Sequence, residues 1–339
     1  MKYTFPTLFI CIVLFSCSSE SNDQTHTQPN PTSTLTPTRT PSVQPSPTLE
    51  PLPLPTPTES PEVLVTPAEH PGCTNSGHQA PRRAEILDSH ELWLGSLYGS
   101  SLDEGYKLLS GASVPDGLLY KDVIHLWWVS SLDHTIHHGT VNEGSLTDLG
   151  SISIDGEIFS GMVDPDLVQL TDGSLGLTVL DGFDKPGSPG PICHLRSTDG
   201  QEFFTHSTML DLEERFDPSV VLVEDQWWLA VGIPADENSL TEIYRGNIGQ
   251  EFTLEAQVKG AVPDIAYFDG QFHLLTCSLN GMLSYTSPDG KDWALIDTTL
   301  FSGCDPSRVT GTNFLAYKKE QGGGNEMMPP LSGEPHPTR

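Results

Sequence analysis

The sequence predicts an all-β fold, a five-bladed β-propeller, and three observations lead to this prediction. A short phrase that joins proline to an acidic or small polar residue occurs five times. Each occurrence begins a series of short strand-like segments separated by turns. The last series lacks two strands, whereas the segment before the first series has two strands in excess. A supersecondary unit that recurs about every 45 residues is typical of repeat folds such as propellers.

The recurring phrase marks the start of each predicted blade. Its prolines are spaced by 50, 53, 45 and 43 residues. The five copies are Val114-Pro115-Asp116, Asp164-Pro165-Asp166, Asp217-Pro218-Ser219, Pro263-Asp264-Ile265 and Asp305-Pro306-Ser307. Proline is tolerated at the first residue of a strand, where no donor is needed for the ladder. We therefore expect each copy to begin the innermost strand of a blade.

The fuller repeats contain about four short strands each. In the third repeat the strand-like segments are 220–223, 226–231, 242–245 and 252–254. Several neighbouring segments are separated by hairpin signals such as Asp172-Gly173 and Asp269-Gly270. Asp-Gly between two apolar segments is a strong signal for a tight hairpin. The repeat unit is therefore a small antiparallel sheet.

The ends of the domain complement each other. The fifth repeat has two strand-like segments, near 308–309 and 313–317, and then a glycine-rich tail. Two further segments, around 92–95 and 106–109, precede the first repeat. Together they make one four-stranded blade, which closes the ring and protects the sheet edges. We therefore expect the propeller to span 73–319 and the tail, 320–339, to be disordered.

The N-terminus is typical of an exported bacterial protein. Lys2 precedes a short apolar segment, 8–15, that is too short for a transmembrane helix, so residues 1–16 are predicted to be a signal peptide. The following Leu14-Phe15-Ser16-Cys17 resembles a lipobox, which implies a lipid on Cys17. The other interpretation is an ordinary secreted protein. We expect a lipid-anchored protein of the bacterial cell envelope that faces away from the cytoplasm.

Residues 17–72 form a Pro/Thr-rich linker, in which apolar side chains are too few to form a core. Such a segment acts as an extended spacer, either O-glycosylated or unmodified. The chain carries a formal net charge of −29. Such an acidic chain is poorly suited to a polyanionic partner, so nucleic acid is not expected.

The cysteines indicate disulfides and no metal site. Four lie beyond the linker, namely Cys73, Cys193, Cys277 and Cys304. In an exported protein they allow two disulfides in three possible connectivities. A Cys73–Cys304 bond would join the two ends of the propeller, and we take it as a working hypothesis. None of the spacings suggests zinc, and we expect no metal and no cofactor.

Six aspartates flank the recurring prolines. Asp164, Asp217 and Asp305 precede a proline, whereas Asp116, Asp166 and Asp264 follow one. Alternate residues of a strand share a face, so all six are expected at one mouth of the central channel, in two adjacent layers. Clustered carboxylates raise one another's pKa, which is one way to place a protonated acid beside an ionised base. The structural alternative is that an aspartate beside a proline caps a turn.

This pattern resembles the five-bladed glycosidase superfamily of arabinanases, xylosidases and fructan-cleaving enzymes, over about residues 90–318. The resemblance implies an aspartate nucleophile or base on the first blade, a second aspartate that tunes it, and a glutamate acid on a later blade. Asp116 matches the first position loosely, and Asp164 or Asp166 matches the second. No glutamate stands beside a recurring proline, and Glu213 and Glu214 are the nearest substitutes.

Two functions therefore remain open. The first is a glycoside hydrolase with Asp116, Asp164, Asp166 and Glu214 as catalytic candidates and Asp217, Asp264 and Asp305 as ligand-binding candidates. The second is a non-catalytic propeller that binds a glycan or a protein. Both rest on the recurring acids and on the resemblance.

Other conspicuous residues have structural interpretations. The hairpins 197–203 and 287–293 are similar to the sialidase Asp-box, but we expect them to be tight turns whose glycine adopts a positive φ. The doublets Trp127-Trp128 and Trp227-Trp228 are expected in the core, and the alternative is that one ring of each stacks on a sugar. His137 and His138 would face opposite sides of a strand, which makes them a poor metal pair.

Overall fold

The computed structural model describes residues 89–98, 101–181, 191–212, 214–299 and 302–321. The predicted signal peptide, Cys17, the Pro/Thr-rich linker, Cys73 and nearly all of the predicted tail lie outside these residues. Within the described ranges, no helix combines the length and the apolar character that a membrane span requires.

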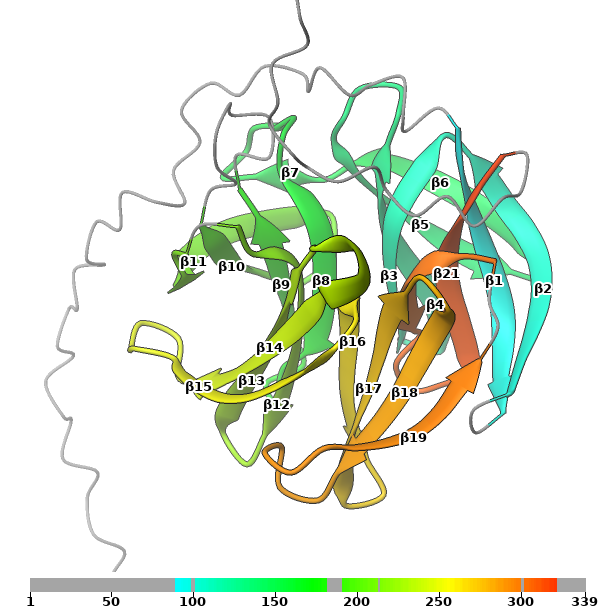
Figure 1. Ribbon diagram of the computed structural model, residues 1–339. Helices are drawn as coiled ribbons and strands as arrows, with labels where there is room; N and C mark the ends of the chain where they lie inside the picture. The colour runs from blue at the N-terminus through cyan, green and yellow to red at the C-terminus, as the bar shows by residue number, and fades with distance from the viewer. Residues whose placement is uncertain (1–88, 99–100, 182–190, 213, 300–301, 322–339) are drawn as a thin grey trace, which may run out of the picture. The chain divides into compact units, whose positions relative to one another are not determined.

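Five antiparallel sheets surround a central axis, as Figure 1 shows, and each is a blade. Blade 1 comprises β3 (Ala112–Tyr120), β4 (Val123–Ser130), β5 (Ile136–Asn142) and β6 (Ser145–Ser151). Blade 2 comprises β8 (Val163–Gln169), β9 (Leu175–Leu180), β10 (Ile192–Ser197) and β11 (Glu202–Leu210), and the short β7 (Ser153–Ile154) pairs in parallel with β11.

Blade 3 comprises β12 (Phe216–Val223), β13 (Gln226–Ile233), β14 (Leu240–Gly246) and β15 (Thr253–Lys259), with the 3₁₀ turn η1 (Asp236–Asn238) between β13 and β14. Blade 4 comprises β16 (Ala261–Phe268), β17 (Gln271–Ser278), β18 (Gly281–Ser287) and β19 (Ala294–Thr299). Blade 5 comprises β20 (Cys304–Arg308), β21 (Phe314–Glu320), β1 (His90–Tyr98) and β2 (Ser101–Ser110).

Blade 5 is built from both ends of the described chain, as the sequence predicts. Its strand order from the axis outwards is β20, β21, β1 and β2. Strand β1 runs antiparallel to β21, with His90 opposite Glu320 and Ser96 opposite Phe314. The N-terminal strands therefore supply the outer half of the blade that the C-terminal strands begin.

Every innermost strand begins with a β-bulge at its recurring proline. The pairing register shifts at this point in all five blades. In each bulge the residue before the proline has a positive φ, and these residues are Val114 (48°), Asp164 (55°), Asp217 (49°), Val262 (55°) and Asp305 (49°). This conformation is unusual for any residue other than glycine, and most strained for the two valines. The bulge turns the two flanking side chains towards the axis of the propeller, where they line one cavity.

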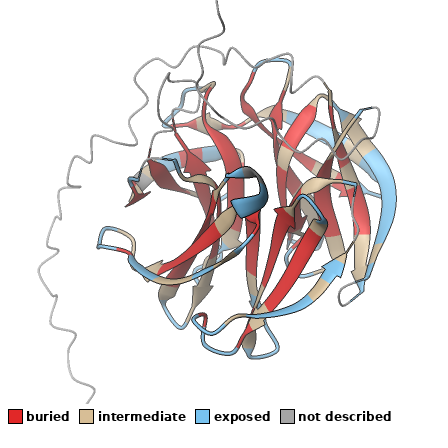
Figure 2. Cartoon of the chain, in the orientation of Figure 1, coloured by how far each residue is buried: buried red, intermediate tan, exposed pale blue. Residues whose placement is uncertain are grey.

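Apolar side chains fill the space between the blades, and Figure 2 shows the buried residues concentrated in the strands. All four tryptophans of the two doublets are buried, so none is available to stack on a sugar. Trp127 Nε1 donates to the Gly200 carbonyl of blade 2 at 3.0 Å. A Cβ atom at Gly290 of blade 4 would lie 2.4 Å from the Trp228 ring. The two Asp-Gly hairpins are therefore docking points for a tryptophan of the preceding blade.

A disulfide links Cys277 to Cys304, with a Cα–Cα distance of 5.9 Å. It joins β17 of blade 4 to the start of β20 in blade 5. The working hypothesis of a Cys73–Cys304 bond is therefore wrong. The bulge in β20 places Cys304 beside the neighbouring blade, a proximity that distance along the chain does not reveal. Cys193 is also disulfide-bonded.

The Cys277–Cys304 bond is expected to stabilise the junction of blades 4 and 5. It spans 27 residues, for which loop-closure entropy gives a stabilisation of about 3.5 kcal/mol. The double variant Cys277→Ser/Cys304→Ser should lose about that free energy of unfolding, measured by chemical denaturation. Ser145→Ala, at an exposed position of β6, is the control. A double variant as stable as the native protein would contradict this expectation.

Candidate functional site

Six of the seven predicted site residues surround one cavity on the axis. The cavity is lined by the recurring prolines of all five blades and by the residues that flank them, except Ser219, and its volume open to water-sized molecules is about 30 Å³. Asp116, Asp164, Asp166, Asp217, Asp264 and Asp305 are all buried around it. The strand starts therefore gather these acids at one place, although their sequence positions extend over four-fifths of the propeller.

The residues after the prolines form a ring of hydrogen bonds between neighbouring blades. Asp116 Oδ2 accepts from Leu167 N at 2.6 Å, Asp166 Oδ1 from Val220 N at 2.9 Å, Ser219 Oγ from Ile265 N at 3.0 Å, and Asp264 Oδ1 from Arg308 N at 3.1 Å. Ser307 Oγ donates to Asp116 Oδ1 and closes the circle. In the first four links the donor is the second residue after the next proline. We call Asp116, Asp166, Ser219, Asp264 and Ser307 the post-proline ring.

The aspartates before the prolines form a second layer, which we call the pre-proline acids: Asp164, Asp217 and Asp305. Asp164 Oδ2 accepts from Asp217 N at 3.2 Å. Asp305 forms a buried ion pair with Lys318 of β21, with Nζ and Oδ2 2.7 Å apart. In the post-proline ring the corresponding cation is Arg308, whose Nη1 lies 2.5 Å from Asp264 Oδ2. Each layer therefore holds three carboxylates and one cation, which is buried at Lys318 and partly buried at Arg308.

Burial and mutual repulsion keep several of these carboxyl groups protonated. Burial, and then the charge of Asp305, raises the pKa of Asp164 to about 7. Burial also raises the pKa of Asp116 to about 7, although hydrogen bonds from Ser307 and the Leu167 N–H oppose the rise. The pKa values of Asp166 and Asp217 rise well above the ordinary range through burial and the charges of neighbouring acids. Several carboxyl groups of the site therefore carry a proton near neutral pH.

Glu214 does not join this cluster. It is exposed, in a turn just before β12, and has a φ of 58°. The buried glutamate of blade 3 is Glu242 in β14, which accepts from Arg215 Nε at 2.7 Å and Tyr244 OH at 2.7 Å. Burial opposes its ionisation, but these hydrogen bonds and one from Gln257 lower its pKa. Glu242 is thus an ionised structural partner, and its place beside the apolar pair Ile243-Tyr244 in a predicted strand is the sequence signal that could have identified it.

Metal ligation is not supported in the part of the chain that the structure describes, where no group of three or more His, Cys, Asp or Glu side chains has a suitable arrangement. His137 and His138 face opposite sides of β5, as the sequence predicts. His137 Nδ1 contacts Asp148, whereas His138 Nε2 contacts His125 Nδ1 at 2.9 Å.

Comparison with known proteins identifies the fold. No protein-family model matches the chain, and no curated protein sequence matches it. Among solved structures it is similar to Zg3597, a family 117 glycoside hydrolase of the marine bacterium Zobellia galactanivorans. The TM-score is 0.50 at 10% identity, over 67% of this chain and 81% of that chain.

Two further solved structures are more distant. The GH32 β-fructofuranosidase BmSUC1 of Bombyx mori has a TM-score of 0.46 at 16% identity, over 62% of this chain and 55% of that chain. A thermostable family-43 glycoside hydrolase has a TM-score of 0.45 at 10% identity, over 61% and 83%. The chain thus spans about half the length of the Bombyx mori enzyme. The chain shares its fold with the family 117 glycoside hydrolase, and at 10% identity the likeness concerns the fold alone.

The raised pKa values predict that the protein loses stability as pH rises through neutrality. A carboxyl group whose pKa is raised in the folded state stabilises the fold while it is protonated, and this contribution is lost as pH rises through the folded pKa of about 7. The melting temperature should therefore fall by several degrees between about pH 6.5 and 8.5. Asp164→Asn should reduce this fall, and Asp122→Asn, in an exposed turn, should not. A melting temperature that stays constant over this range would refute the expectation.

The post-proline ring makes a second prediction. Ser219→Ala leaves the buried Ile265 N–H without its acceptor, which should lower the free energy of unfolding by about 1 to 3 kcal/mol. Urea denaturation measures the loss, with Ser145→Ala as the matched exposed control. Equal stability of the two variants would show that the ring contributes nothing at blade 3.

Proposed function

We propose that this protein is a non-hydrolytic propeller that binds glycans outside the cytoplasm. The observation that carries the proposal is that the axial acids hydrogen-bond neighbouring blades to each other. Asp116, Asp166 and Asp264 each accept a backbone N–H of the next blade, so they act as joints between blades. The glycan class comes by analogy from the fold that the chain shares with a family 117 glycoside hydrolase.

The geometry of the cavity argues against glycosidic cleavage. Hydrolysis by two carboxyl groups needs the sugar between them, with the groups roughly 5 to 10 Å apart. The axial cavity, at about 30 Å³, admits water-sized molecules and is too small for a sugar ring. Glu214, the candidate proton donor, is exposed outside this cavity. A hydrolase would need this cavity to widen enough to admit a sugar ring.

Hydrolysis is the second candidate, and one observation favours it. The pKa values of Asp116 and Asp164 are raised to about 7, which is the range that suits a general acid near neutral pH. The pre-proline acids are also less involved in joining the blades than the post-proline ring. For hydrolysis to occur, the cavity would have to widen next to Asp164 and Asp217 so that a sugar could enter.

The cellular location of the protein is part of the proposal. A disulfide persists in an oxidising compartment, so the Cys277–Cys304 bond supports export. We infer that Cys17 carries a lipid, that the Pro/Thr-rich linker holds the propeller away from the membrane, and that the protein faces outside the cytoplasm at the bacterial envelope. A net charge of −29 is unfavourable for nucleic acid.

A glycan panel separates the two candidates. The native protein should bind a subset of glycans on an array and release no reducing ends from any of them. Asp116→Asn and Asp164→Asn should retain binding, because the amide oxygen can still accept the backbone N–H of the next blade and the amide NH2 of Asn at 116 can donate to the Ser307 hydroxyl. Both variants are checked by thermal melting before they are assayed.

Glu214→Gln is the matched control, because it alters an exposed candidate outside the cavity. Turnover by the native protein that disappears in Asp116→Asn, with folding intact, would replace the proposal by the hydrolase. Absence of binding to every glycan, together with absence of turnover, would refute both candidates.

A further inference from the structure

The loop between β4 and β5, residues 131–135, connects the entrances of two blades. Ser131 N donates to the Gly111 carbonyl, just before β3, at 2.9 Å. Gly161 N, just before β8, donates to the His134 carbonyl at 3.3 Å, and Thr135 forms a bridge with Ser160. Since β3 and β8 carry the recurring prolines of blades 1 and 2, the position of this loop determines how the chain enters both innermost strands.

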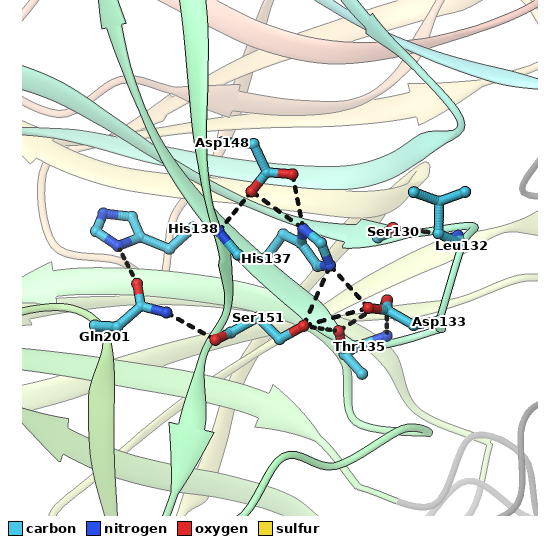
Figure 3. Close-up of polar contacts among 10 residues, drawn as sticks. Ser130, Leu132, Asp133, Thr135, His137, His138, Asp148, Ser151 and Gln201 are labelled. Atoms are coloured by element: carbon cyan, nitrogen blue, oxygen red, sulfur yellow. Dashed lines mark hydrogen bonds and ion pairs between the residues drawn. The ribbon is translucent and has the colours of Figure 1, made fainter.

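His137 ties this loop to the outer strand of blade 1, as Figure 3 shows. Its Nε2 lies 3.1 Å from Asp133 Oδ2 in the loop, and its Nδ1 lies 3.0 Å from Asp148 Oδ2 in β6. A carboxylate only accepts hydrogen bonds, so both ring nitrogens have to donate. The imidazole can do so only when it is protonated.

Ser151 gives the cluster the composition of a Ser-His-Asp nucleophile site, but the geometry opposes that chemistry. Ser151 Oγ lies 3.3 Å from His137 Nε2, whereas Asp133 Oδ2 lies closer to the same nitrogen, at 3.1 Å. A base must present a lone pair to the serine hydroxyl, and here Nε2 carries a proton that Asp133 accepts. Ser151 also accepts from Thr135 Oγ1 at 2.8 Å, so it belongs to the polar network around Asp133.

The charged groups that face His137 are both acidic. Among the described residues these are Asp133 from the loop and Asp148 from β6, while Thr135, Ser151 and the Trp128 ring of β4 are neutral neighbours. Burial disfavours the imidazolium ion, but the hydrogen bonds and charges of the two aspartates outweigh it and raise the pKa of His137. The two carboxylates are partly exposed, so a proton can pass between His137 and solvent.

We propose that Asp133, His137 and Asp148 form a pH-dependent latch that holds loop 131–135 closed over the entrances of blades 1 and 2. In the closed state the imidazolium bridges both carboxylates. When the proton leaves to solvent, one ring nitrogen presents a lone pair to a carboxylate, and that contact becomes repulsive. Asp148 also accepts from Gly150 N at 2.7 Å within its own strand, and Asp133 accepts from Thr135 N at 3.2 Å within the loop, so each carboxylate stays with its own element when the His137 bridge breaks.

The direction of the switch follows from the raised pKa. A histidine that gains acidic partners on folding stabilises the closed state fully below its unfolded pKa, about 6.5, and this contribution is lost as pH rises through the higher folded value. The latch is therefore closed in mildly acidic surroundings and opens as pH rises through the raised pKa of His137. It acts on the entry segments of Pro115 and Pro165, and it does not depend on the proposed glycan binding.

A titration by NMR tests the latch in the full chain. The His137 ring signals and the backbone amides of Asp133, Thr135 and Gly161 are followed from about pH 5.5 to 9. All are expected to change with one common midpoint above 6.5. Asp148→Asn should lower that midpoint by about one pH unit, because one acidic partner is lost. Asp133→Asn provides a second variant if Asp148→Asn does not fold.

Asp122→Asn is the matched control, since this exposed acid lies in the turn between β3 and β4, and it should leave the midpoint unchanged. If the His137 hydrogen bonds had only a structural role, the signals of the loop amides would not change with the same midpoint as the His137 ring signals. The latch is refuted if the His137 midpoint is at or below 6.5, if the loop amides titrate separately, or if both folded variants keep the native midpoint.

Discussion

The fold depends on a circle of side-chain to backbone hydrogen bonds at its axis. Sheets of a propeller share no ladder with their neighbours, so something else has to fix their spacing and their tilt. Here a short polar side chain after each recurring proline reaches the next blade. It accepts a backbone N–H at the first four blades, as Ser219 and Asp116 do, and it donates a hydroxyl at the fifth, where Ser307 meets Asp116. Longer side chains would hold the blades apart, and apolar ones would leave buried N–H groups unsatisfied.

The same circle concentrates negative charge where solvent is nearly absent. Six carboxyl groups surround the cavity, and the positive charges of Lys318 and Arg308 would neutralise only part of their negative charge. Burying an unpaired charge is costly, so the fold retains protons instead. This explains why the acids look catalytic in the sequence. Raised pKa values are a property of enzyme sites, but a carboxyl oxygen that holds a neighbouring blade has little freedom to act on a ligand.

The architecture could be predicted from the sequence because its signals are local. Each proline, each Asp-Gly turn and the two missing strands of the fifth repeat lie within a few residues of the feature that they specify. The five blades and the closure by β1 and β2 are confirmed for this reason. The role of the axial acids was not predictable in the same way, because the Leu167 N–H that Asp116 meets is on another blade.

Other features escaped prediction for related reasons. The Cys277–Cys304 bond depends on where the bulge in β20 places Cys304, and chain order favours the terminal pairing instead. Glu242 carries no flanking proline, so the recurring phrase does not indicate it. His137 was correctly separated from His138, but its two carboxylate partners come from a loop and from another strand.

The composite blade has a consequence for how the molecule is made. Strand β1 is among the first parts of the propeller to be synthesised, and its partner β21 is the last of the described strands, so the edge of the β1–β2 hairpin stays unpaired until β21 has been made. Contacts between such distant residues form slowly, and an exposed edge invites pairing with other chains. Premature termination anywhere before Phe314 would leave this hairpin without its partner. The fifth blade can therefore form only after its C-terminal strands have been synthesised, because β1 pairs with β21.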